Sequence, residues 1–314
     1  MKRVVSVSLG SSKRDKKHAT TILGQEFIIE RVGTDGDLKA FQSKFEELDG
    51  KVDALGVGGA DIYVVVGDKR YTFRQIKNLI KNVKHTPVVD GSGLKHTLER
   101  EAINILTEVI DWPVERVLLV SAVDRYGMAQ ALDKRCRHVV YGDLLFGIGL
   151  PIPLRTYASV KRVANLLLPI ITKLPFKWFY PTGKKQDERT PKHKKWFDWA
   201  TVICGDWHYI RRYAPDDLVG KTIITQTLRK ADLDWLKSTG AKRAITTTPD
   251  MGGEAFATNV MEAVIITLAG KMPEEMTEDD YLSQLRSLSW MPNVIELQGV
   301  PDQSGKMPEP ELEK

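Results

Sequence analysis

The residues best suited to chemistry lie in the turn after an apolar run at 117–120 and in an aspartate, Asp143, that ends the next apolar run. Strand, turn, helix, strand and a closing acidic residue form the order of a mononucleotide-binding βαβ unit. In such a unit the turn holds a pyrophosphate, and the closing carboxylate accepts a hydrogen bond from a ribose hydroxyl, which favours NAD over NADP. The turn residues assigned to this cofactor are Ser121, Ala122, Asp124, Arg125 and Gly127.

The glycine pattern of this turn is incomplete. Of the three glycines in G-x-G-x-x-G only Gly127 is present, and Val123 stands at the second position, where a Cβ keeps the backbone away from a pyrophosphate. Asp124 adds negative charge where a helix N-terminus would bind phosphate, although Arg125 could compensate for it. A βαβ unit with a purely structural role therefore stays open as the alternative.

Short apolar strands alternate with amphipathic helices along the chain, which predicts an α/β protein with two domains. We expect an N-terminal α/β domain of the substrate-binding type at residues 1–100. A C-terminal Rossmann-like domain with a doubly wound parallel sheet would follow at 101–298. That domain would include a basic insertion at 155–198 and the C-terminal helices. Residues 299–314 contain few apolar side chains that could be buried, so we expect a disordered tail there.

The overall composition is that of a soluble globular protein, with 42% hydrophobic and 28% charged residues among 314. The two cysteines, Cys136 and Cys204, are far apart and lack metal-ligand spacing, so we expect neither a metal site nor a disulfide framework. The first residues do not have the pattern of a signal peptide. These features predict a cytoplasmic location.

The positive charge is concentrated in residues 161–195, which contain ten Lys and Arg and two acidic residues. The remaining chain is slightly acidic, so we expect no nucleic-acid partner. The longest uncharged stretch of the segment, 163–172, is too short to span a bilayer, which needs about 20 residues. The segment predicts peripheral contact with an anionic membrane, a cover over a site for an acidic or acyl substrate, or a solvated loop; these alternatives stay open.

Several segments resemble a group of bacterial proteins catalogued as quinate 5-dehydrogenases, which are distantly similar to shikimate dehydrogenases. They include VSVSLGSS, DGSGLKHTLER, VLLVSAVDRYGMA and TTTPDMGGEAFATNVMEAVI, and the resemblance covers nearly the whole chain. It implies an NAD(P)-dependent oxidoreductase that acts on a hydroxyl or carbonyl group of a small quinate-like or shikimate-like substrate in an interdomain cleft. The alternatives are a protein without dehydrogenase activity that docks through its basic segment, or an acyl-group reductase at a membrane surface.

The resemblance also implies site residues. Shikimate dehydrogenases pair a lysine with an aspartate, and here Asp90 and Lys95 would supply that pair, with Lys95 moving the hydroxyl proton and Asp90 orienting it. The alternative is a helix N-cap formed by Ser92, with Lys95 in solvent. Thr247 and Pro249, which follow a later strand, would line the nicotinamide side. The residues assigned to the substrate are Ser6, Ser8, Ser92 and Thr97.

Overall fold

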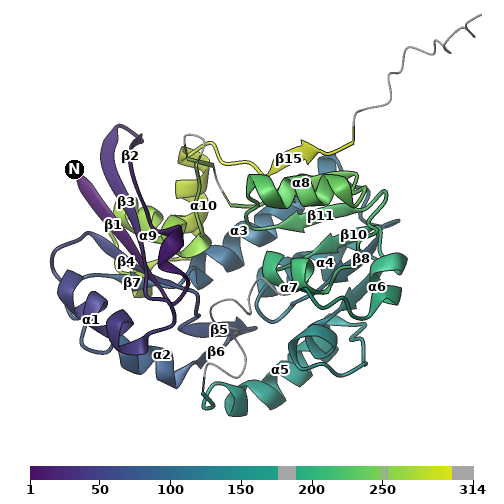
Figure 1. Cartoon of the computed structure of the whole chain (residues 1–314), viewed down its shortest axis with the longest axis horizontal. Helices are drawn as coiled ribbons and strands as arrows, with labels where there is room; N and C mark the ends of the chain where they lie inside the picture. Colours follow the sequence, from purple (N-terminus) through teal and green to yellow (C-terminus); the bar gives the residue numbers. More distant parts are fainter. Residues whose placement is uncertain (176–188, 249, 252–253, 299–314) are drawn as a thin grey trace, which may run out of the picture.

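Two mainly parallel sheets, one in each half of the chain, organise the molecule (Figure 1). The computed structural model describes residues 1–175, 189–248, 250–251 and 254–298. The predicted tail at 299–314 and the middle of the predicted basic segment lie outside the described residues. A mixed α/β fold with two domains is confirmed.

The first sheet has the strand order β2-β3-β1-β4-β7, and all of its strands run parallel except β2. Its strands are β1 (Lys2–Ser8), β2 (Lys16–Ile22), β3 (Gln25–Gly33), β4 (Ala54–Gly58) and β7 (Val88–Val89). A separate antiparallel hairpin of β5 (Tyr63–Val66) and β6 (Lys69–Thr72) follows β4. This hairpin turns at Gly67-Asp68, where glycine and aspartate suit a two-residue turn.

Helices cover both faces of the first sheet. Phe41 and Phe45 of α1 (Leu38–Leu48) and Ile76 of α2 (Arg74–Leu79) pack against one face. Three helices supply the apolar side chains on the other face, namely α3 (Ser92–Ile105), α9 (Thr258–Ala269) and α10 (Glu278–Ser287). The assignment of the C-terminal helices to the second domain is therefore wrong, because the chain returns to bury α9 and α10 against the first sheet.

The second sheet has the order β15-β12-β11-β10-β8-β9, and all of its strands run parallel except β15. Its strands are β8 (Arg116–Leu119), β9 (His138–Tyr141), β10 (Val202–Cys204), β11 (Thr222–Thr225), β12 (Arg243–Thr246) and β15 (Asn293–Glu296). A small hairpin, β13 (Asp250–Met251) with β14 (Glu254–Ala255), lies outside it.

Alternate residues of β8 point to opposite faces of this sheet, as the period of a strand requires. Val117 and Leu119 pack with α3, α4 (Tyr126–Arg135) and α5 (Tyr157–Ile171). Leu118 packs on the other face with α6 (Lys194–Trp199), α7 (Trp207–Tyr213) and α8 (Lys230–Ser238). Because both faces are covered, the central residues of the parallel strands in this sheet are apolar and buried.

The arrangement of the strands directs attention to the space between the domains. In the first sheet β1 lies between β3 and β4, and in the second sheet β8 lies between β9 and β10. Within each sheet the chain therefore continues first on one side of this central strand and later on its other side. Ligands of open α/β sheets bind at the carboxyl ends of strands at such points. Helix α3 packs in the cores of both domains and so joins the two sheets.

Candidate functional site

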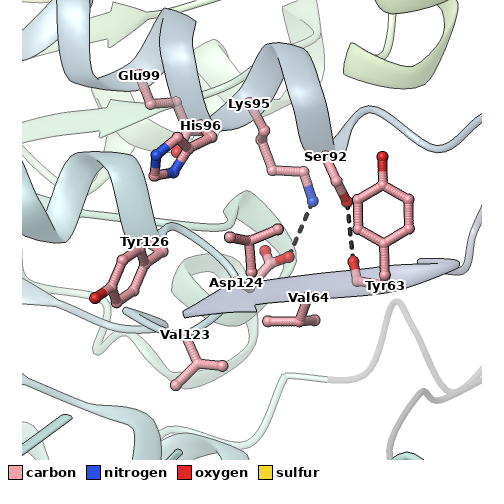
Figure 2. A pocket seen from close by; sticks show the side chains of 10 residues that line it. Tyr63, Val64, Ser92, Lys95, His96, Glu99, Val123, Asp124 and Tyr126 are labelled. Carbon is pink, nitrogen blue, oxygen red and sulfur yellow. Dashed lines mark hydrogen bonds and ion pairs between the residues drawn. The ribbon is translucent and has the colours of Figure 1, made fainter. Parts of the chain in front are cut away.

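A narrow pocket lies between the two domains (Figure 2). Its walls come from β5 of the first domain, from α3 and from the turn that leads into α4 of the second domain. The polar and aromatic residues that line it include Tyr63, Ser92, Lys95, His96, Asp124 and Tyr126. The cavity of about 20 Å³ has room for about one water molecule.

Lys95 is the central cation of the pocket, one turn into α3. Its Nζ lies 2.9 Å from Asp124 Oδ1 and 3.2 Å from Asp61 Oδ1, and Figure 2 shows it pointing toward Asp124. Asp61 follows β4 and Asp124 follows β8, so the lysine bridges the two domains. Burial alone would lower the pKa of Lys95, but the charges of Asp124 and Asp61 outweigh it and raise that pKa. Lys95 therefore stays protonated at neutral pH.

Arg125 is a second, fully buried cation beside Lys95, with its side chain 4% exposed. It forms a close ion pair with Glu99, and its Nη2 lies 2.9 Å from Asp206 Oδ2. Asp206 follows β10 and begins α7, where its other oxygen accepts from the His208 N–H. Burial opposes ionisation of Asp206, but the charge of Arg125 prevails and lowers the pKa to about 2. Burial raises the pKa of Glu99, although Arg125 opposes that shift.

The charges of this cluster do not balance. Four carboxylates gather around the two cations Lys95 and Arg125, namely Asp61, Glu99, Asp124 and Asp206. With every group ionised, the cluster carries an excess of negative charge. In the described ranges, no three His, Cys, Asp or Glu side chains are arranged to hold a metal ion. The excess charge disfavours an anionic ligand, which includes both a dinucleotide and a carboxylate such as quinate.

The turn assigned to the cofactor is occupied by the protein's own groups. Asp143 Oδ1 accepts from the Val123 N–H at 2.8 Å, an amide that a pyrophosphate would need. Burial raises the pKa of Asp143 to about 6, although hydrogen bonds from the backbone oppose this shift. Ser121 and Ala122 are buried. The prediction of a dinucleotide cradle is therefore wrong, because carboxylates fill the place of the phosphates.

Gly127 has a different role from the one its motif suggests. A Cβ at this position would lie 2.1 Å from the carbonyl oxygen of His96, so the missing side chain lets α4 approach α3. Thr247, assigned to the nicotinamide side, is fully buried, and its N–H donates to the Thr225 carbonyl. Pro249 lies outside the described residues. Of the described residues assigned to the cofactor, only Asp124 borders the pocket.

The predicted catalytic pair of Asp90 and Lys95 is also wrong. Asp90 Oδ2 accepts from the backbone N–H groups of Ile62 and Tyr63, and Oδ1 accepts from the Ser92 N–H at 2.9 Å. Asp90 therefore holds the start of α3 against the hairpin and does not orient Lys95. The alternative of a Ser92 N-cap fails as well, since Gly91 occupies that position with a φ of 95°. Lys95 lies in the ion-pair cluster and not in solvent.

The residues assigned to the substrate make contacts within the protein. Ser6 Oγ accepts from Asn259 Nδ2 at 2.7 Å, and Ser8 Oγ accepts from the Gly10 N–H at 3.1 Å. The Ser92 hydroxyl donates to the Tyr63 carbonyl at 3.0 Å (Figure 2), and Thr97 is buried inside α3. Of these four residues only Ser92 borders the pocket.

Three acidic residues of the cluster escaped the reasoning from sequence: Asp61, Glu99 and Asp206. Two signals in the sequence point to them. Asp61 and Asp206 each follow a short apolar strand after a glycine, at the end where ligands of parallel sheets bind. Glu99 lies four residues after Lys95 and so shares a face of the same helix. A search for charges at strand ends would have selected the loops that contain Asp61, Asp124 and Asp206.

Comparison with known proteins gives two family matches. A family model described as domain of unknown function (DUF8754) matches residues 93–297, and a second model, domain of unknown function (DUF8753), matches residues 3–90. Among curated proteins, none matches this sequence.

Solved structures similar to this chain include three sugar-binding proteins. AraP, an arabinose binding protein from Geobacillus stearothermophilus, is 10% identical with a TM-score of 0.41, and the match covers 94% of this chain and 97% of AraP. A solute binding protein of an ABC transporter from Agrobacterium vitis, bound with alpha-D-tagatopyranose, is 9% identical with a TM-score of 0.39 and 97% of both chains covered. GanP, a glucose-galactose binding protein from Geobacillus stearothermophilus, is 13% identical with a TM-score of 0.37, covering 96% of this chain and 99% of GanP.

The family models that match are described as domains of unknown function and not as shikimate or quinate dehydrogenases, so the resemblance to quinate 5-dehydrogenases is wrong. The predictions of dehydrogenase activity and of an NAD or NADP cofactor are wrong for the same reason. The structure gives the physical reason, because the turn is closed by Asp143 and the cleft carries excess negative charge. TM-scores below 0.5 assign neither a fold family nor a ligand to this chain.

Proposed function

We propose that this chain, which belongs to the DUF8754 family, binds a small uncharged polyhydroxylated molecule in the cleft between its two domains. The observation that carries this proposal is the row of charges formed by Lys95 of α3 with residues of the loops that follow β4, β8 and β10. Going from the first domain to the second, the row reads Asp61, Lys95, Asp124, Arg125 and Asp206. Carboxylate acceptors thus alternate with cationic donors.

A ligand hydroxyl group matches such a row because it donates one hydrogen bond and accepts others. It can donate to Asp124 while it accepts from Lys95, and a neighbouring hydroxyl can do the same with the next pair. An anionic ligand would instead meet the surplus of carboxylates. A cationic ligand would satisfy carboxylates but leave Lys95 and Arg125 facing a like charge. An uncharged molecule with several hydroxyl groups avoids both costs.

Aromatic side chains form the walls beside the charges. The rings of His96 and Tyr126 are stacked, with centroids 6.0 Å apart and an interplanar angle of 13°, and Tyr63 lies on the side of the hairpin. Such rings can pack against the apolar faces of a polyhydroxylated ring. The pocket has room for about one water, so a ligand of this size enters only when the domains separate and the Lys95–Asp61 contact opens. The sugar-binding proteins named above do not assign their ligands to this chain.

The test is thermal unfolding of the full chain with uncharged monosaccharides and inositols, with quinate as the anionic probe and a polyamine as the cationic probe. A ligand at 100 times its Kd stabilises by about 2.7 kcal/mol, which raises Tm by about 5 °C or more. Asp124→Asn should weaken binding at least about tenfold, because the amide no longer accepts with a full charge. The matched control, Asp279→Asn, changes an exposed residue of α10 and should leave binding intact. A rise in Tm with quinate alone, or no rise in Tm with any uncharged polyol, would refute the proposal.

A further inference from the structure

Five large apolar side chains within residues 148–170 are exposed, three of them before α5 and two on α5 itself. They are Ile148, Leu150, Ile152, Leu166 and Ile170. Leu166 is 71% exposed and Ile170 is 59% exposed, and the two are four residues apart on α5, so they are neighbours on its surface. Clustered exposed apolar surface commonly marks a place of interaction.

Helix α5 presents two different faces. Val160, Ala164 and Leu168 are buried on its inner face. The helix is also fixed to the first domain, where the Tyr71 hydroxyl donates to Asn165 Oδ1 at 2.6 Å. Its outer face is therefore available without any change in the core, and Figure 1 shows α5 at the lower edge of the molecule.

The outer face combines apolar and basic side chains. Arg162, Leu166 and Ile170 recur every four residues and so lie in one row along the helix, and exposed Lys173 follows the last turn. Residues 144–175 contain four Lys and Arg and no acidic residue. This stretch of the chain consequently carries positive charge and has no acidic residue of its own.

An anionic bilayer surface satisfies both properties of this face. Leucine and isoleucine can enter the boundary between headgroups and acyl chains, while arginine and lysine remain at the anionic headgroups. A second copy of the chain would bring like charges together. None of the helices in the described part of the chain combines the length and apolar character needed to cross a membrane. We propose that the outer face of α5, with Arg162, Leu166, Ile170 and Lys173, docks the protein on the surface of an anionic membrane.

Sedimentation of the full chain with lipid vesicles tests this proposal. Vesicles of phosphatidylcholine mixed with phosphatidylglycerol should carry the protein into the pellet at low salt. Binding should weaken as salt rises, because the contact with the headgroups is screened. Vesicles of phosphatidylcholine alone should bind much less. Protein that remains in the supernatant with the anionic vesicles at both low and high salt would overturn the proposal.

Substitutions distinguish binding through the outer face of α5 from nonspecific adsorption of the protein to vesicles. Leu166→Asp combined with Ile170→Asp should lower the vesicle partition coefficient at least about tenfold, since it removes the inserted apolar area and adds negative charge. Val219→Asp is the matched control, because Val219 is 68% exposed on the second domain away from α5. Circular dichroism should show that both variants are folded. Wild-type binding by the double variant would contradict the proposal, as would equal loss in the control.

Discussion

Replacing Arg125 with methionine should strongly destabilise the folded protein. Methionine fills much of the same volume but cannot neutralise Glu99, whose side chain is only 2% exposed. Within the described residues, Glu99 Oε2 has no hydrogen-bond partner, so Arg125 supplies the direct compensation for this buried carboxylate. The substitution also removes the contact with Asp206 at 2.9 Å.

The magnitude follows from the burial of the pair. Removing one partner of a buried ion pair costs about 3–5 kcal/mol, because the other charge is left uncompensated. Burial already raises the pKa of Glu99, and loss of Arg125 should raise it further. An acid with a raised pKa in the folded state loses stability as pH rises through that pKa. The loss of unfolding free energy caused by Arg125→Met should therefore be smaller at pH 5 than at pH 7, by about 1–2.5 kcal/mol.

Urea unfolding of wild type and Arg125→Met at these two pH values measures both quantities. Lys194→Met is the matched control, because Lys194 pairs with Asp198 on the surface of α6 and should contribute only about 0.3–0.5 kcal/mol. Glu99→Gln added to Arg125→Met should restore part of the lost stability. A cost for Arg125→Met below about 1 kcal/mol, or one that is equal at both pH values, would refute the reasoning.

Two further substitutions test the contacts of α3 with its neighbours. Burial and the charge of Asp90 raise the pKa of Glu262 to about 7, so its contribution is full below about pH 4.5 and is lost as pH rises through 7. Glu262→Gln should reduce the difference in unfolding free energy between pH 5 and pH 8 by about 1–3 kcal/mol. If that difference is unchanged in the variant, a group other than Glu262 causes the pH dependence. Gly127→Ala should lower Tm by several degrees, since its Cβ would overlap the His96 carbonyl, whereas Gly147→Ala enters open space and should not.

Local patterns in the sequence determined much of the fold. Apolar residues alternate with serine at residues 4–9, which is the period of a strand and matches β1, and Gly67-Asp68 supplies the turn of the hairpin of β5 and β6. The alternation of strands and helices predicted two α/β domains, with a parallel sheet in the second, and the structure has parallel strands in both. These predictions succeed because the period of a strand or helix and the conformation of a turn depend on residues close in sequence.

Contacts between distant segments were decided only by the tertiary structure. The last two helices cover the first sheet because the chain crosses back after β12, and no local pattern records that return. Asp90 and Lys95 are close in sequence, yet Asp90 binds backbone amides while Lys95 extends from α3 to Asp61 and Asp124. Arg125 and Asp206 pair across 81 residues. Which charged residues pair depends on which strand ends lie close together in space. The packing of the two sheets determines this proximity.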